Sequence, residues 1–380
     1  MSDLELKKQI QELVKAKEGT RTPRWLYRFF ANFPGQWRIN RLLPPPPSQS
    51  APYHVIHKDP LIITIPEDVY EYPKQWKPFF DTLQGKKVYF LCRIRYTVED
   101  ASVLRIMDYY YNRWMKEHYP EFRFIFLANT ILEYELLKDR RLEAIFCNQN
   151  CFVDENLYYP YEITRQYDAV YNARPIPLKN FNLAKKVSSL ALITYFTSNI
   201  EKLFFERLKQ ELPDAIALNF NGKKLALCDI RDYEYLPPDQ ISKELCRAYV
   251  GLCLSEREGA NYASIEYLLS GLPVVSVPSI GGRDVFFDSK YCFIVEKNPD
   301  AVRDAVLQAK PMSISPQEIR QTTLEKINQH RRRFIALLQE ILDENGKNIS
   351  GEEVFKIAFI NRMYRTQPVQ NIETLIELRE

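Results

Sequence analysis

Two kinds of hydrophobic pattern take turns along the chain, and each predicts a different element. Short runs dense in β-branched and aromatic residues are typical of buried strands, whereas apolar residues spaced three and four apart are typical of amphipathic helices. In the first half, strand-like runs span 86–94, 122–128 and 142–147, and the helical segments between them span 99–118 and 131–140. This alternation favours a parallel sheet covered by helices.

The same alternation begins again in the second half. Strands are predicted at 169–172, 190–195, 224–229, 250–254 and 273–277, and helices at 179–186, 199–211, 242–248 and about 260–270. Two further helical stretches, 316–344 and 352–380, are separated by a breaker at 345–348. The predicted fold class is therefore α/β, with two Rossmann-like, doubly wound domains.

The length of 380 residues supports two domains, because one hydrophobic core seldom organises a chain of this size. We place a basic aromatic arm with a proline spacer at 1–50, a first Rossmann-like domain at 51–165, a second at 166–345 and a helical segment at 346–380. No stretch reaches the roughly 18 apolar residues that span a bilayer, and the charged first residues do not resemble a secretory signal. We expect a cytoplasmic protein.

The arm concentrates positive charge, although the whole chain carries only +3, too little to indicate nucleic-acid binding. Residues 1–45 hold nine Lys or Arg against four Asp or Glu, and basic and aromatic side chains alternate through 20–43. Interfacial helices have this composition, which predicts peripheral contact with an anionic membrane. An arm packed on its own protein explains the same pattern, so both interpretations stay open.

Cysteine and histidine give no metal site. The seven cysteines are an odd number and lie in apolar runs, and the one close pair, Cys147 and Cys151, has no second pair. None of the four histidines stands at ligand spacing. We expect reduced, buried thiols.

Glycine points to the ligand-binding loops. The sequence contains neither GxxxxGK[ST] nor GxGxxG, which argues against the ordinary P-loop and dinucleotide sites. Of its eleven glycines, five lie between positions 251 and 282. Because glycine lets the backbone approach a ligand closely, a binding site is predicted there.

The segment 255–275 reads as a strand end, an acidic glycine-containing turn, a helix ended by Gly271 and another buried strand. A helix that begins at the carboxyl edge of a parallel sheet favours a phosphate group. Glu258 and Glu266 flank this position. Two carboxylates beside an anion are costly unless they bind hydroxyl groups, so sugar and ribose hydroxyls are the obvious candidates.

Glu258, seven residues, then Glu266, followed by SGLPVV at 270–275, resembles the EX7E signature of the family 4 retaining glycosyltransferases. That family has the GT-B fold, in which two Rossmann-like domains face a central cleft. The resemblance implies that Glu258 contacts the donor sugar, that Glu266 binds the ribose and that the backbone between them holds the diphosphate. The donor-binding residues implied are Gly259, Ala260, Asn261, Tyr262 and Glu266, with Gly281 and Gly282 as the family's glycine pair.

Arg174, four residues, then Lys179 looks like the G-R-x4-K opening of the family's C-terminal, donor-binding domain. The resemblance implies that both cations neutralise the leaving diphosphate. Fixed cations beside a developing negative charge stabilise the transition state directly. The catalytic residues implied are therefore Arg174, Lys179 and Glu258. Segment 153–160 is similar to the family's interdomain linker.

The resemblance implies a retaining, hexosyltransferase-type glycosyltransferase that moves a sugar from a nucleotide-diphosphate donor to a glycan or lipid-linked acceptor, as in polysaccharide or glycolipid synthesis. The nucleotide sugar is a substrate, and no metal or other cofactor is expected. Two alternatives stay open: a nucleotide-sugar epimerase and a non-catalytic, glycosyltransferase-like binding or scaffold protein. His54, His57 and His118 are possible counterparts of a family histidine near the reacting sugar. The chain departs from the family in having no glycine-rich loop after 88–94.

Overall fold

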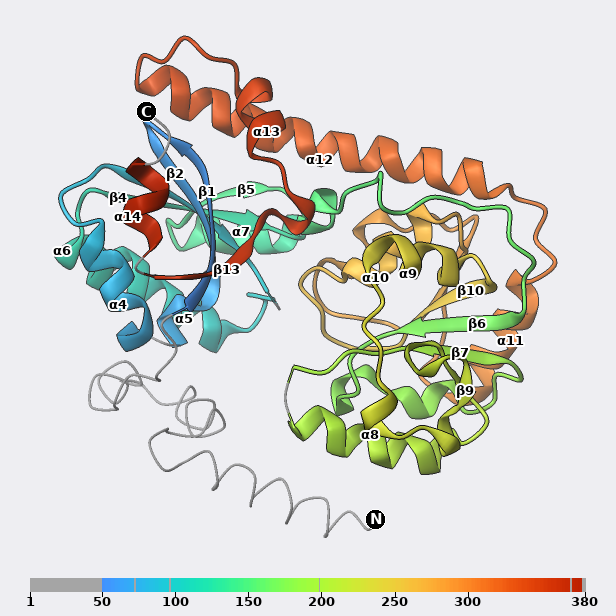
Figure 1. The fold of residues 1–380 in the computed structure, drawn as a ribbon. Coiled ribbons are helices and arrows are strands. Elements are labelled where there is room, and N and C mark those ends of the chain that lie inside the picture. Colours follow the sequence, from blue (N-terminus) through green and yellow to red (C-terminus); the bar gives the residue numbers. More distant parts are fainter. Residues whose placement is uncertain (1–49, 72, 96, 198, 370, 378–380) are drawn as a thin grey trace. The chain divides into compact units, whose positions relative to one another are not determined.

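The computed structural model describes residues 50–71, 73–95, 97–197, 199–369 and 371–377, which form two compact units (Figure 1). Of these residues, 153–327 make up the central unit, and those up to 152 and from 328 onward make up the amino-terminal unit. The arm predicted to contact a membrane, 20–43, lies outside the described residues. Within the described part of the chain, no helix is both long and apolar enough to cross a bilayer.

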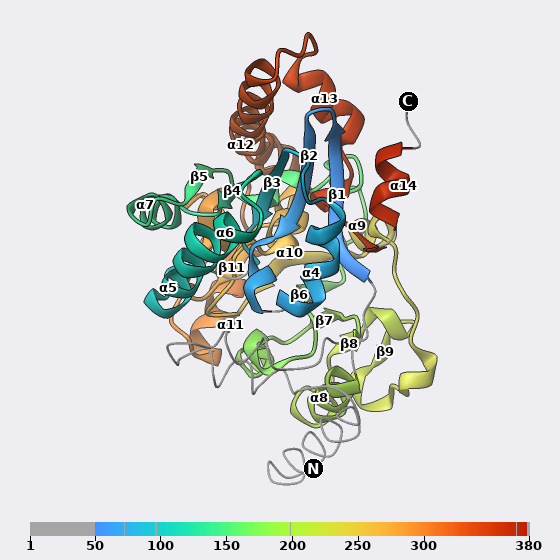
Figure 2. The same cartoon turned by 90° about the vertical axis from the view of Figure 1, so that its left-hand side faces the viewer.

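A six-stranded sheet in the order β13-β1-β2-β3-β4-β5 forms the centre of the amino-terminal unit (Figure 2). Strands β2 to β5 are parallel, whereas β1 pairs antiparallel with β2 and β13. Aromatic rings fill the core beside β3 and β4; those of Phe80 and Phe90 meet edge to face, 5.5 Å apart. The strands are β1 (Ser50–Lys58), β2 (Leu61–Pro66), β3 (Val88–Arg93), β4 (Phe122–Ala128), β5 (Glu143–Phe146) and β13 (Arg365–Pro368).

Helices cover this sheet. A helical segment from 101 to 118 includes one π-helical stretch, Tyr110–Met115. That segment consists of α5 (Ala101–Tyr109), the π-helical stretch and α6 (Lys116–His118). The other helical elements are η1 (Glu67–Glu71), α4 (Pro73–Thr82), α7 (Ile131–Asp139), η3 (Gln149–Phe152), α13 (Gly351–Ala358), η10 (Asn361–Met363) and α14 (Asn371–Glu377). Helix α12 (Pro316–Glu344) begins in the central unit and ends in the amino-terminal unit.

The central unit contains a seven-stranded sheet in the order β12-β11-β10-β6-β7-β8-β9. Strands β6 and β10 are adjacent and parallel, and from them the chain order runs outward in both directions. This is a doubly wound sheet whose switch point lies between β6 and β10. The strands are β6 (Tyr167–Asn172), β7 (Leu190–Ile193), β8 (Ile216–Ala217), β9 (Lys223–Lys224), β10 (Ala248–Cys253), β11 (Val274–Ser276) and β12 (Cys292–Ile294).

The prediction of two Rossmann-like α/β domains is confirmed. The structural units divide at 152/153 and 327/328, whereas the sequence analysis placed the divisions at 165/166 and 345/346. The helix predicted at 199–211 is present as α8 (Asn199–Glu211), and α12 has the predicted bounds. Other helices of the central unit are α9 (Pro238–Leu245), α10 (Tyr262–Leu269) and α11 (Pro299–Ala309).

Three predicted elements are wrong. Within the predicted strand at 224–229, residues 225–227 form a 3-10 turn, and the final helix at 352–380 is interrupted by β13, which pairs with β1. The helix at 179–186 is replaced by two 3-10 turns, η4 (Pro177–Lys179) and η5 (Phe181–Ala184). Asn180 separates them with a left-handed backbone (φ 48°, ψ 44°), which an α-helix does not accommodate.

Candidate functional site

The switch point of the central sheet places the three predicted catalytic residues after adjacent parallel strands. Arg174 and Lys179 follow β6, and Glu258 follows β10, the parallel neighbour of β6. The connections after these two strands lead in opposite directions in the sheet, and the carboxyl edge at such a point is where doubly wound sheets bind ligands. Residues 79 positions apart in sequence therefore share one edge of the sheet.

Lys179 and Glu258 form an ion pair at this edge. The Lys179 ammonium donates to Glu258 Oε1, and the two side chains are only 14% and 10% exposed. Ser255 Oγ donates to the same carboxylate oxygen over 2.6 Å. The Asn180 side chain donates to the carbonyl of Leu254 over 3.0 Å, which ties the loop after β6 to the end of β10. The two ion-paired residues were predicted from the sequence, whereas the contacts that support them were not.

Arg174 is held by α8 instead. Its Nη1 lies 3.3 Å from Glu201 Oε1, and the arginine side chain is about one-third exposed, whereas that of Glu201 is buried. Glu201 also accepts hydrogen bonds from the backbone N–H and the hydroxyl of Thr197, just before the helix. Glu201 thus fixes Arg174 at the carboxyl edge. This role was not predicted from the sequence, because an acidic residue in a first helical turn usually stabilises the N-terminus of its own helix.

The loop before α10 is closed by backbone hydrogen bonds to the turn after β11. Glu258 N–H donates to the carbonyl of Ile280 over 3.0 Å, and Gly282 N–H donates to the carbonyl of Gly259 over 2.8 Å. Gly281 has φ = 99°, a conformation that favours glycine. Gly282 of the predicted glycine pair therefore contacts the predicted donor loop directly.

Asn261 caps α10. Its side-chain oxygen accepts from Ser264 N–H, and Tyr262 is the first helical residue. The first turn of a helix presents N–H groups that have no intrahelical partner, so it favours an anion. The predicted donor loop lies between Glu258 and the body of α10, at the position that the EX7E resemblance implies. It consists of Gly259, Ala260, Asn261 and Tyr262.

Glu266 points into the protein. It is 1% exposed, and its two carboxylate oxygens accept from the Tyr158 hydroxyl over 3.0 Å and from the Asn172 side chain over 2.9 Å. The next residue, Tyr267, accepts from Asn172 N–H over 2.6 Å. A Cβ added to Gly251 would lie 2.3 Å from the Tyr267 ring, so β10 needs glycine where α10 packs on it.

Among the residues that the structure describes, Arg283 is the largest side chain that is completely buried, and no sequence pattern predicted a role for it. Its guanidinium donates to the carbonyls of Cys253 and Ser255, over 3.2 and 2.5 Å, and to that of Val277. It also pairs with Asp284 over 2.7 Å. One planar donor group therefore joins the carboxyl ends of β10 and β11.

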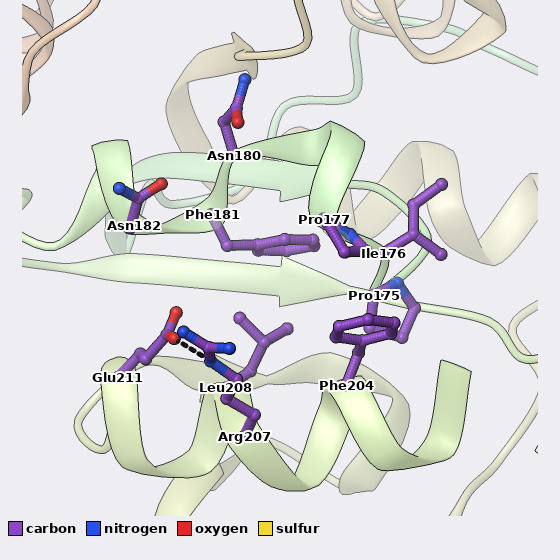
Figure 3. A pocket seen from close by; sticks show the side chains of 10 residues that line it. All are labelled: Pro175, Ile176, Pro177, Asn180, Phe181, Asn182, Phe204, Arg207, Leu208 and Glu211. Atoms are coloured by element: carbon purple, nitrogen blue, oxygen red, sulfur yellow. Dashed lines mark hydrogen bonds and ion pairs between the residues drawn. The ribbon is translucent and has the colours of Figure 1, made fainter. Parts of the chain in front are cut away.

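A cavity of about 340 Å³ lies beside this site, between the loop after β6 and α8 (Figure 3). Leu208 rises from α8 toward Phe181 and Phe204 toward Pro175, and Arg207 pairs with Glu211 at one end over 2.6 Å. None of its lining residues is a predicted catalytic or donor-binding residue. The full lining is Pro175, Ile176, Pro177, Asn180, Phe181, Asn182, Phe204, Arg207, Leu208 and Glu211.

Histidine rings, cysteine thiols and clusters of metal ligands are the other candidate chemical groups of the chain. The rings of His54, His57 and His118 each hydrogen-bond a backbone carbonyl, of Ala358, Pro60 and Trp114 respectively. Burial raises the pKa of the Cys253 thiol to about 12, so at neutral pH it is not a thiolate nucleophile. Among the described residues, no group of three or more His, Cys, Asp or Glu side chains could hold a metal ion.

Comparisons with known proteins give a likeness in structure only. No protein family and no curated protein sequence matches the chain. Among similar solved structures, TarM is 14% identical, with a TM-score of 0.48 over 73% of this chain and 54% of TarM. This chain therefore spans about half the length of TarM. The trehalose-phosphate synthase of Burkholderia xenovorans, in complex with glucose-6-phosphate, is 12% identical, with a TM-score of 0.48 over 77% and 75% of the chains. Anabaena HepE, in complex with UDP, is 13% identical, with a TM-score of 0.47 over 74% and 84%.

Proposed function

We propose that this chain is a GT-B glycosyltransferase that moves a sugar from a nucleotide-diphosphate donor to a hydroxyl acceptor. The observation that carries the proposal is the meeting of Lys179 and Glu258 at the switch point of a doubly wound sheet. A cation suits the diphosphate, and a carboxylate one hydrogen bond away suits the hydroxyls of the sugar attached to it. The resemblance of the sequence around both residues to family 4 supports the same assignment.

In the proposed reaction, the bond between the anomeric carbon and the donor phosphate oxygen breaks, and a bond from that carbon to the acceptor oxygen forms. The departing phosphate takes the acceptor proton on the same face, so the configuration of the sugar is retained. Lys179 and Arg174 stabilise the charge that grows on the diphosphate, and the backbone of 259–262 and of Gly281 and Gly282 surrounds it. Glu258 orients the sugar.

In this proposal, Glu266 binds the ribose of the donor nucleotide. Its carboxylate is already oriented by Tyr158 and Asn172, so the ribose hydroxyls would join or replace these two donors. A charge-assisted hydrogen bond of this kind contributes about 1.5–3 kcal/mol. The acceptor is a glycan or a lipid-linked hydroxyl, in polysaccharide or glycolipid synthesis, and contact of 20–43 with an anionic membrane would bring the enzyme to a lipid-linked one.

A ligand panel tests the proposal. Melting temperatures measured with UDP, GDP and ADP, each alone and as nucleotide sugars, should rise for one base, because a ligand at 100 times its dissociation constant adds about 2.7 kcal/mol of stability. Phosphorus NMR should then show slow release of the nucleoside diphosphate from that sugar without an acceptor. The Lys179→Ala variant should lose turnover, whereas Lys356→Ala, which removes an exposed lysine of α13, should keep it. A panel without any shift would rule out the donor site, and binding without turnover would favour a non-catalytic binding protein.

A further inference from the structure

The two carboxylate oxygens of Glu258 have different surroundings. Oε1 accepts from both Lys179 and Ser255. Among the residues that the structure describes, no group donates to Oε2. Because the side chain is held through one oxygen, the other keeps its acceptor capacity and a fixed direction.

Ser255 is itself held from behind. It is completely buried, and its carbonyl accepts from Arg283 over 2.5 Å while its hydroxyl donates to Glu258 over 2.6 Å. Arg283 also donates to the carbonyls of Cys253 and Val277, so its planar group sets the distance between the ends of β10 and β11. A rigid fork that binds three carbonyls leaves Ser255 little freedom, and Ser255 in turn restricts the carboxylate.

We infer that Ser255 and Arg283 are positioning residues for Glu258, and that Oε2 is the atom that accepts a hydrogen bond from the donor sugar. This inference rests on the proposed function. Neither residue touches the substrate in this scheme; each acts through the direction of the Glu258 carboxylate. A small misplacement of a reacting group lowers the rate strongly, so the effect belongs in kcat.

The test compares variants at Ser255. Ser255→Ala removes the hydroxyl and adds no bulk, so the fold should persist. We expect kcat to fall about tenfold, because one charge-assisted hydrogen bond is lost, with the affinity for the free nucleoside diphosphate unchanged. Ser255→Thr, which keeps a hydroxyl, should recover most of the rate. A kcat for Ser255→Ala equal to the wild-type value would overturn the inference, and so would equal losses in the Ala and Thr variants.

Arg283 is tested by coupling. Arg283→Lys keeps the charge but cannot reach all three carbonyls, and its effect on kcat should be much smaller in a Ser255→Ala background, because both act through Glu258. Effects that multiply fully would remove Arg283 from the scheme. Calorimetry of wild-type protein with the nucleoside diphosphate distinguishes failure of the proposed function from failure of the positioning roles. Absence of binding refutes the proposed function. Normal binding and turnover of the wild type, together with wild-type kcat values in the Ser255 and Arg283 variants, refute only the positioning roles.

Discussion

The ion pair between Lys179 and Glu258 allows a test in which a double variant should regain part of the lost stability but none of the lost activity. We consider Lys179→Met, Glu258→Gln and the double variant. Breaking a fully buried pair by removing one partner costs about 3–5 kcal/mol, because the remaining charge has no partner. Here the side chains are 14% and 10% exposed, so water reaches the remaining charge in part. We expect Lys179→Met to lower the free energy of unfolding by about 2–3 kcal/mol.

Glu258→Gln should cost less, about 1–2 kcal/mol, because the neutral amide oxygen still accepts from Ser255 and from the ammonium. The double variant leaves no unpaired charge. Its loss should therefore be about 1–2 kcal/mol, well below the sum of the two single losses. Its turnover should stay as low as that of the worse single variant, since the proposed mechanism needs the cation and the carboxylate for separate tasks.

The assay is urea denaturation for stability, together with initial rates of nucleoside diphosphate release. Lys186→Met is a matched control in the same unit, because Lys186 pairs with Asp300 at an exposed position where ion pairs contribute little. Additive stability losses in the double variant would refute the coupling. Recovery of activity along with stability would mean that the pair is only structural.

Three further outcomes follow from the structure. Glu266→Gln should weaken nucleotide binding by about 1–3 kcal/mol in calorimetry, and normal binding would contradict a ribose role. Burial, with the charge of Arg333, lowers the pKa of His330 from 6.5 to about 4, so the unfolded chain takes up this proton first and stability is lost as the pH falls from 6.5 to about 4. His330→Gln should reduce that loss by up to about 3 kcal/mol in urea denaturation; an identical profile would contradict the buried neutral ring. Gly251→Ala should cost about 3 kcal/mol in thermal melts, since Tyr267 leaves no room, and an unchanged melting temperature would disprove that packing.

The elements predicted well are those whose signal is local. Helix α12 shows its apolar period over 29 residues, and β4 is an apolar run interrupted only by Arg123, so neighbours in sequence were sufficient to place both. The hairpin of β1 and β2 was missed, although β2 is buried throughout. Strand β13 is polar and partly exposed, and it exists because it pairs with β1 about 300 residues earlier. No local pattern contains that pairing.

The residues of the candidate site also differ in whether a local sequence pattern could predict them. Arg174, Lys179 and Glu258 were predicted through spacings that resemble a known signature. The spacing from Glu258 to Glu266 follows from a turn and the start of α10, whereas Lys179 ends a 3-10 turn and not the first turn of a helix. Glu201 and Arg283 could not be found in this way. Charged residues are mostly exposed, and only the tertiary structure shows that these two are buried against the loops they hold.

The charges of the site lead to one more expectation. Each of its three cations already has a carboxylate partner: Arg174 has Glu201, Lys179 has Glu258, and Arg283 has Asp284. A diphosphate that attracts Lys179 therefore leaves the largely buried Glu258 short of a donor, which is unfavourable unless a sugar hydroxyl donates to Oε2 in compensation. The intact nucleotide sugar should consequently bind at least about tenfold more tightly than the nucleoside diphosphate alone, a difference of about 1.4 kcal/mol. Calorimetry with a non-transferable donor analogue measures this difference. It should shrink in Glu258→Gln, whose neutral amide does not need the compensating donor, and equal affinities of the wild type for both ligands would show that Glu258 does not face the sugar.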